Sequence, residues 1–172
     1  MCFLGHLPCF MNIFTPAVRK SMFAALALCV LGIADCLFLL KLHFSVGTFN
    51  AFLCAPHSTF DCDAVNRSIY ATLFGIPVAF VGLGGYLLIL MLTALFFRGT
   101  KTVDGIRHDR RYVLAALGSS ILGAAFAYYL LAMEMFVLKT YCPYCLLSLA
   151  TISALIILFW WTYVHTAPKR SP

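Results

Sequence analysis

The chain has 172 residues, of which 63% are hydrophobic and only 10% are charged, and its mean hydropathy is +0.96. These values lie well outside the range of water-soluble domains, so the composition excludes an ordinary soluble enzyme. The net charge of +6 comes from basic residues in short segments beside apolar stretches, not from one face of a folded domain. A nucleic-acid-binding function is therefore not expected.

Four apolar stretches are long enough to cross a bilayer, at 21–42, 71–97, 113–137 and 143–164. A membrane helix needs about 20 residues, because each residue adds about 1.5 Å of rise. The four stretches and their connections occupy nearly the whole chain. We therefore expect an all-α fold, an integral membrane four-helix bundle over residues 21–164 in contact with the lipid bilayer. Short tails at 1–20 and 165–172 would flank it.

The distribution of basic residues predicts the orientation of this bundle. Nine of the twelve Lys and Arg residues fall before the first stretch, between the second and third, or after the fourth: Arg19, Lys20, Arg98, Lys101, Arg107, Arg110, Arg111, Lys169 and Arg170. Because basic residues are retained in the cytoplasm, both termini are expected to be cytoplasmic. The segment from His43 to about Ile69 and the short turn at 139–141 would then face the outside.

Four cysteines fall on this outer side, where disulfides form and persist. Cys142 and Cys145 form a Cys-x-x-Cys at the start of the fourth stretch, and Pro143 is typical of the first turn of a helix. Residues i and i+3 share a helix face, so the two thiols lie within disulfide reach. The positive end of the helix dipole stabilises a thiolate at this position. Spacing and position together predict redox chemistry.

The other two outer cysteines, Cys54 and Cys62, lie in the loop between the first two stretches. A disulfide between them would be exposed to a protein partner, and exposed bridges tend to be labile and catalytic. A bridge that only stabilises the fold is the alternative. Asp61 or Asp63 is expected to cap a short helix over 64–70, which would hold Cys62 near the membrane surface.

Two competing interpretations use the same residues. Cys54, His57, Cys62 and the Cys142/Cys145 pair offer enough soft or borderline ligands for a tetrahedral zinc site. We expect no metal, because the outer face of a membrane favours disulfides. A non-catalytic four-span scaffold held by disulfides is the other interpretation.

Gly75 and Pro77 interrupt the second apolar stretch near its start. Proline removes one backbone hydrogen bond from a helix, so this pair predicts a kink. A bent helix can leave a pocket beside it, and a kink filled by neighbouring side chains is the alternative.

Polar residues inside the apolar stretches also need an interpretation. An ionised Asp35 within the first stretch would cost about 2.5 to 3.5 kcal/mol, so we expect it to be hydrogen-bonded inside the bundle, with a proton route as the alternative. Cys29 and Cys36, in the same stretch, are expected to be small apolar core residues. Glu134 and Lys139 are expected to be interface anchors whose side chains reach toward water.

The order of these motifs resembles the vitamin K epoxide reductase family. The resemblance rests on the spaced pair in the first outer loop, the late Cys142-x-x-Cys145, and the run Cys62-Asp-Ala-Val-Asn-Arg-Ser68-x-Tyr70 leading into Phe74-Gly75-Ile76-Pro77. It covers roughly residues 21–164. The disulfide bond formation protein B family also has four spans and four cysteines, but its adjacent pair comes first and its spaced pair second.

The sequence differs from animal members of the family at two places. Those members carry a Trp-Gly-Arg-Gly-Phe-Gly-like stretch after the loop cysteine, where this chain has Arg67-Ser68-Ile69-Tyr70-Ala71. They also carry a Tyr four residues after the last cysteine, where this chain has Leu149. Both differences favour the bacterial disulfide-forming branch over epoxide reduction.

The resemblance implies a membrane thiol oxidoreductase of the bacterial inner membrane. It implies that Cys54 takes electrons from a separate periplasmic thioredoxin-fold disulfide donor and that Cys62 passes them to Cys142. Cys145 would face a membrane quinone, either ubiquinone or menaquinone. The residues that it suggests for a quinone pocket are Cys145, Ser68, Phe74 and Leu149.

Overall fold

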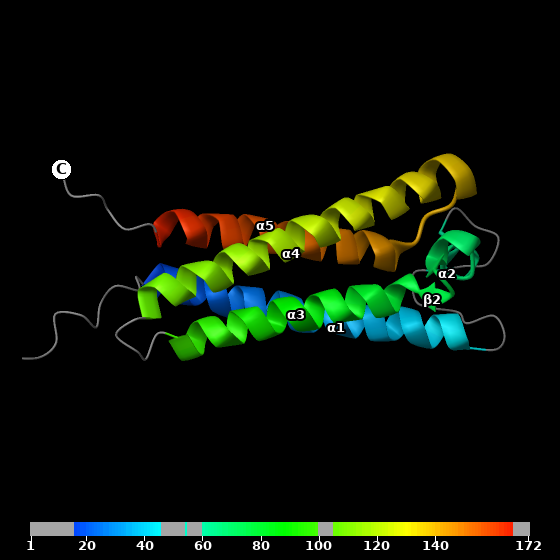
Figure 1. Cartoon of the computed structure of the whole chain (residues 1–172). Helices are drawn as coiled ribbons and strands as arrows, with labels where there is room; N and C mark the ends of the chain where they lie inside the picture. Colours follow the sequence, from blue (N-terminus) through cyan, green and yellow to red (C-terminus); the bar gives the residue numbers. More distant parts are fainter. Residues whose placement is uncertain (1–15, 46–53, 55–59, 100–104, 167–172) are drawn as a thin grey trace, which may run out of the picture.

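Four long helices form the molecule in a computed structural model, which describes residues 16–45, 54, 60–99 and 105–166. They are α1 (Pro16–Phe44), α3 (Val78–Gly99), α4 (Gly105–Met133) and α5 (Pro143–His165). Successive long helices run in opposite directions, so α1 begins and α5 ends at the same end of the bundle (Figure 1). All four are long and apolar enough to cross a membrane. The predicted all-α membrane bundle is confirmed.

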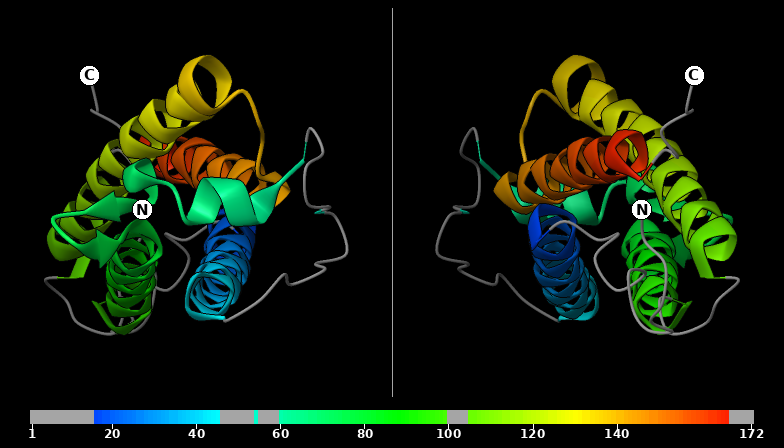
Figure 2. Two further views of the ribbon diagram at one scale, coloured as in Figure 1. Left: turned by 90° about the vertical axis from the view of Figure 1, so that its right-hand side faces the viewer. Right: turned by 90° about the vertical axis from the view of Figure 1, so that its left-hand side faces the viewer.

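The long helices pack as a closed ring (Figure 2). α1 packs against α3 and α5, and α4 packs against the same two helices. Met22, Cys29 and Leu155 are completely buried between them. Large apolar side chains such as Leu122 and Ile157 are instead more than two-thirds exposed on the outside, at 75% and 69%. Such a surface suits lipid, because a soluble protein rarely exposes large continuous apolar areas.

Small elements connect α1 to α3 and cover one end of the bundle. They are α2 (Cys62–Asn66), the 3-10 helix η1 (Ile69–Ala71), and the strands β1 (Thr72–Leu73) and β2 (Ile76–Pro77). Figure 2 shows α2 running across this end. The side chain of Asp61 caps α2 by accepting the backbone N–H of Ala64 at 3.0 Å, as one of the two predicted caps would. The helix itself is shorter than the predicted 64–70.

The expected kink in the second span is wrong, because this span begins only at Val78. Residues before it form a hairpin in which Thr72 pairs with Pro77 and Leu73 with Ile76. Phe74 and Gly75 make the turn with φ angles of 53° and 81°. Positive φ at both central residues is the conformation of the two-residue hairpin turns that match strand twist. Gly75 and Pro77 therefore reverse the chain ahead of the helix and do not bend it.

One close contact inside the ring yields a stability prediction. A Cβ atom at Gly32 of α1 would collide with the aromatic ring of Tyr86 on α3. Tyr86 is 4% exposed, and its hydroxyl donates to the Ser148 carbonyl on α5, so the ring has little freedom to move. We expect Gly32→Ala to destabilise the protein by about 1–3 kcal/mol through overpacking.

Thermal unfolding in detergent micelles measures this effect. Gly84→Ala is the matched control, because a Cβ there meets no atom within 4 Å. Equal melting temperatures for the two variants would contradict the close packing of α1 on α3.

Candidate functional site

The four outer cysteines come together at the end of the bundle that α2 covers. Cys62 and Cys142 belong to one buried cluster, and Cys54 and Cys145 pack against it as partly buried neighbours. The remaining buried members are apolar: Leu39, Leu40, Leu42, Val65 and Ala79. Two cysteine pairs from distant parts of the sequence therefore share one water-poor site.

The outer pair is joined as a disulfide between Cys54 and Cys62, with Cα atoms 5.6 Å apart. Its two sulfurs are not equally accessible. Cys62 is the first residue of α2 and is 1% exposed, whereas Cys54 is only partly buried. A thiol approaching from outside therefore reaches Cys54 more easily than Cys62.

Polar contacts fix α2, and with it Cys62, to the end of α1. Asn66 is buried and its side-chain amide donates to the Leu39 carbonyl at 2.8 Å. The backbone carbonyl oxygen of Asn66 lies 2.7 Å from Nδ1 of His43. Arg67 donates to the Ser45 carbonyl at 2.6 Å and pairs with Asp63 at 2.7 Å. These side chains hold Cys62 against the bundle.

The inner pair lies at the start of α5. Cys142 is the N-cap residue and is fully buried, and its sulfur accepts the backbone N–H of Cys145 at 3.4 Å. Pro143 is the first residue of the helix, as the sequence predicts. Both cysteines are free thiols, and Cys145 is partly buried. The two residues thus share the first turn, where disulfide exchange between i and i+3 is geometrically accessible.

Glu134 belongs to this site, and its prediction as a water-facing anchor is wrong. It is 2% exposed, and its Oε2 accepts the backbone N–H of Cys142 at 3.0 Å. It begins η2 (Glu134–Leu138), a π-helical turn that extends the third span. The signal available in the sequence was the presence of a carboxylate inside a membrane span, since such residues usually have a function. Lys139, by contrast, is exposed, as expected.

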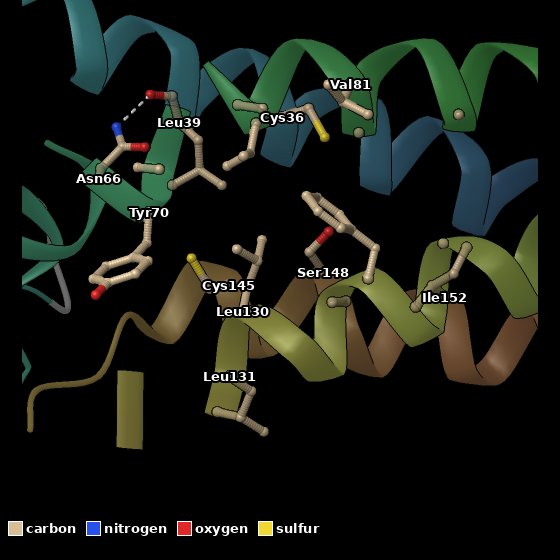
Figure 3. Close-up of a pocket in the computed structure, with 18 of the residues that line it drawn as sticks. Cys36, Leu39, Asn66, Tyr70, Val81, Leu130, Leu131, Cys145, Ser148 and Ile152 are labelled. Carbon is tan, nitrogen blue, oxygen red and sulfur yellow. Dashed lines mark hydrogen bonds between the residues drawn. The ribbon is translucent and has the colours of Figure 1, made fainter. Parts of the chain in front are cut away.

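A cavity of about 410 Å³ opens beside the inner pair, and its walls are mostly apolar. Cys145 lines it from α5, Cys36 lines it from α1, and Figure 3 shows them on opposite sides. Ser68 also lines it, and the Ser68 hydroxyl is a buried oxygen without a hydrogen-bond partner among the described residues. Phe74, which is 95% exposed at the hairpin turn, and Leu149, which packs into the bundle core, are not among its lining residues.

The remaining predicted polar and cysteine residues have separate outcomes. Cys29 and Cys36 are buried in the core, as expected. Asp35 is 6% exposed, but neither carboxylate oxygen has a hydrogen-bond partner among the described residues, so the expected hydrogen bond is wrong there. His57, the histidine of the alternative zinc site, lies outside the described residues.

Comparison with known families matches this chain over most of its length. The model of the vitamin K epoxide reductase family matches residues 23–161. The matched region contains both cysteine pairs, Glu134 and every residue that lines the cavity.

Proposed function

This chain belongs to the vitamin K epoxide reductase family, and from that premise we propose which donor, route and acceptor it uses. Family membership, the Cys54–Cys62 disulfide and the neighbouring thiols make it a membrane thiol-disulfide oxidoreductase. The proposal is that it belongs to the bacterial disulfide-forming branch. It re-oxidises a separate periplasmic thioredoxin-fold protein and passes the electrons through both cysteine pairs to a membrane quinone.

The arrangement of the four cysteines carries this proposal. One pair is bonded and has a partly exposed sulfur, while the other is a dithiol at the wall of an apolar cavity. Cys62 from the first pair and Cys142 from the second are both fully buried in the same cluster. A fold that needed the cysteines only for cross-linking would not need a second pair as free thiols in the same cluster.

The greater exposure of Cys54 supports the first part of the route. A thiolate of the partner attacks the Cys54 sulfur, the Cys54–Cys62 bond breaks, and Cys62 leaves as a thiolate. The partner's second thiol then displaces Cys54, so the partner departs with a disulfide and the outer pair holds two electrons. Such exchange proceeds through a mixed disulfide and favours the accessible sulfur.

The second part lies inside the buried cluster. The Cys62 thiolate attacks Cys142 of an oxidised inner pair, and the bond between Cys142 and Cys145 breaks with its electron pair on Cys145. Cys54 then displaces Cys142 from Cys62 and restores the outer disulfide. The inner pair is left as the dithiol, with Cys145 at the cavity.

The cavity fits a quinone head group in size and chemistry. Small-molecule sites usually occupy about 300–1,000 Å³ and combine apolar walls with a few polar groups. The unpartnered hydroxyl of Ser68 supports this fit, because it offers a donor for a quinone carbonyl. Ser68 and Cys145 would hold the head group, with Phe74 and Leu149 as the weaker suggestions from the sequence. Bound ubiquinone or menaquinone would supply a two-electron, two-proton acceptor.

The location proposed is the bacterial inner membrane, with both termini in the cytoplasm and the cysteines on the periplasmic side. Arg19 and Lys20 at the start of α1, Arg98 at the end of α3, and Arg110 and Arg111 near the start of α4 support it. All five lie toward the end of the bundle opposite the cysteines. Basic residues concentrated at one end favour the cytoplasmic side. The tails at 1–20 and 165–172 would then be cytoplasmic too.

Quinone dependence tests the proposal directly. We expect the purified wild-type chain in lipid nanodiscs to oxidise a reduced thioredoxin-fold protein repeatedly when a short-chain ubiquinone is present. Without quinone we expect at most two partners oxidised per chain, because each of the two cysteine pairs accepts only one electron pair. Loss of partner thiols and of quinone absorbance, followed together, measures both halves of the reaction.

Repeated turnover without quinone would contradict the acceptor. Binding of zinc at one atom per chain, measured by elemental analysis, would instead favour a metal-binding protein. If no oxidation occurs and replacing each cysteine only lowers the melting temperature, the chain is a disulfide-held scaffold.

A further inference from the structure

The carboxyl group of Glu134 touches both residues of the inner cysteine pair. It accepts the Cys142 N–H at 3.0 Å, and it also lies near the Cys145 thiol, whose residue donates its backbone N–H to the Cys142 sulfur. Glu134 is 2% exposed and lines the same cavity as Cys145. A group that exchanges protons therefore lies against a sulfur that must gain and lose one in each cycle.

The local backbone brings Glu134 to this position. α4 ends at Met133, and the next five residues form the π turn η2 before Lys139 adopts a left-handed conformation with φ of 54°. π turns are rare, cost regular hydrogen bonding and occur often at functional sites. Here the turn begins at the residue whose side chain meets Cys142, eight positions later in the chain.

Other titratable groups also line the cavity. They are Cys36 from α1, Tyr70 from η1 and Tyr86 from α3, and the Tyr86 hydroxyl already donates to the Ser148 carbonyl. Among the described residues that line the cavity, Glu134 contributes the one carboxyl group, and none is Lys, Arg or His. Glu134 is thus the group suited to exchange a proton with Cys145.

We propose that Glu134 is a catalytic residue that gives a proton to the Cys145 sulfur and takes it back in each cycle. This role rests on the proposed function. When the Cys62 thiolate attacks Cys142, the new Cys62–Cys142 bond forms and the Cys142–Cys145 bond breaks. Its electron pair goes to Cys145, and the Glu134 carboxyl protonates that sulfur. One negative charge thereby moves from Cys62 to the Glu134 carboxylate, where the Cys142 N–H stabilises it.

Glu134→Gln separates this role from simple packing. The amide oxygen of Gln can still accept the Cys142 N–H, but the side chain cannot exchange a proton. The first measurement uses Cys142→Ser as the background, so that the neighbouring thiol no longer titrates. It is the rate at which iodoacetamide alkylates Cys145 in the fully reduced chain without quinone, followed by mass spectrometry across pH. Two interacting ionisable groups titrate in two steps. We expect two steps in the Cys142→Ser chain and one when Glu134→Gln is added, and a two-step profile with Glu134→Gln would overturn the proposal.

Asp35→Asn is the matched control for this measurement. Asp35 is also a buried carboxyl group in a membrane span, but it does not line the cavity. We expect Asp35→Asn, added to the same Cys142→Ser background, to retain the two-step profile. A one-step profile in this control would overturn the assignment of the first step to Glu134.

The second measurement is the single-turnover reduction of the inner pair. Fully oxidised chain is mixed with reduced thioredoxin, quenched with acid, and assayed for the Cys145 thiol. A positioned acid contributes about 10²–10⁴-fold to such a step, so Glu134→Gln should be slower by about 10²-fold and Glu134→Asp should recover part of the rate. An Asp variant as slow as Gln, with an unchanged melting temperature, would overturn the proposal. Both measurements omit quinone, so the turnover assay of the wild type tests the proposed function separately.

Discussion

With Cys145→Ala we expect quinone-dependent turnover to fall to the uncatalysed background while one partner per chain is still oxidised. The outer disulfide between Cys54 and Cys62 is intact in this variant and can accept one electron pair. Cys142 alone cannot form the inner disulfide, so the electrons have no further route. Rapid-quench measurement of partner thiols should show a burst of one equivalent followed by no steady rate. Such a burst is expected when the first covalent step proceeds and the second, the transfer of electrons to the quinone, is blocked.

Cys29→Ala is the control for this substitution. Cys29 is also a free thiol and is 0% exposed, but it lies in the bundle core and not in the cysteine cluster. We expect its variant to keep the wild-type rate. Steady quinone-dependent turnover in Cys145→Ala would show that electrons leave the protein from another residue.

Cys62→Ser is expected to accumulate a mixed disulfide between Cys54 and the partner. In the wild type the Cys62 thiolate can attack Cys54 again and release a one-cysteine partner by reversal of the first step, and this variant lacks that thiol. The partner should retain only its nucleophilic cysteine, supplied as a mixed disulfide with thionitrobenzoate, so that it cannot release itself. The adduct is measured as a band that disappears on adding reductant and is assigned to Cys54 by peptide mass spectrometry.

Cys54→Ser provides the comparison, since it leaves Cys62 as the free thiol of the outer pair. Cys62 is 1% exposed at the start of α2, so we expect little or no adduct. Equal trapping by the two variants would show that the partner does not distinguish the two sulfurs. Trapping by Cys54→Ser alone would show that the partner reacts with Cys62 and not with Cys54.

Hydropathy and helix-end chemistry were sufficient to predict most of the fold. The four spans follow from stretches that only lipid can solvate, and Pro143 correctly indicated a helix starting just after Cys142. The hairpin at Phe74 and Gly75 was missed because apolar residues run through it into α3, so hydropathy could not separate the turn from the helix. The positive φ of Phe74 also places a bulky residue where glycine is usual.

The candidate site was less predictable than the fold. The distribution of basic residues placed the two cysteine pairs on the same side of the membrane, but it does not indicate that Cys62 and Cys142 share a buried cluster. The contact of Glu134 with Cys142 depends on a π turn, for which the residue pattern has no simple signal. The backbone does offer one indication, because the N–H of Cys142 at the start of the fourth span needs an acceptor, and a carboxylate in the preceding span can supply it. All four suggested quinone-pocket residues stay predictions, although Cys145 and Ser68 line the cavity.

The docking of α2 by Asn66, His43 and Arg67 has a consequence for the working cycle. In the proposed route the Cys54–Cys62 disulfide opens at every turnover. It therefore cannot be the interaction that holds α2 against the bundle throughout the cycle. The hydrogen bonds from Asn66 to Leu39 and from Arg67 to Ser45 involve neither sulfur. They do not depend on the disulfide, so the Cys62 sulfur can become a free thiolate while α2 keeps its position against α1. A reducing pulse should therefore leave α2 in register with α1.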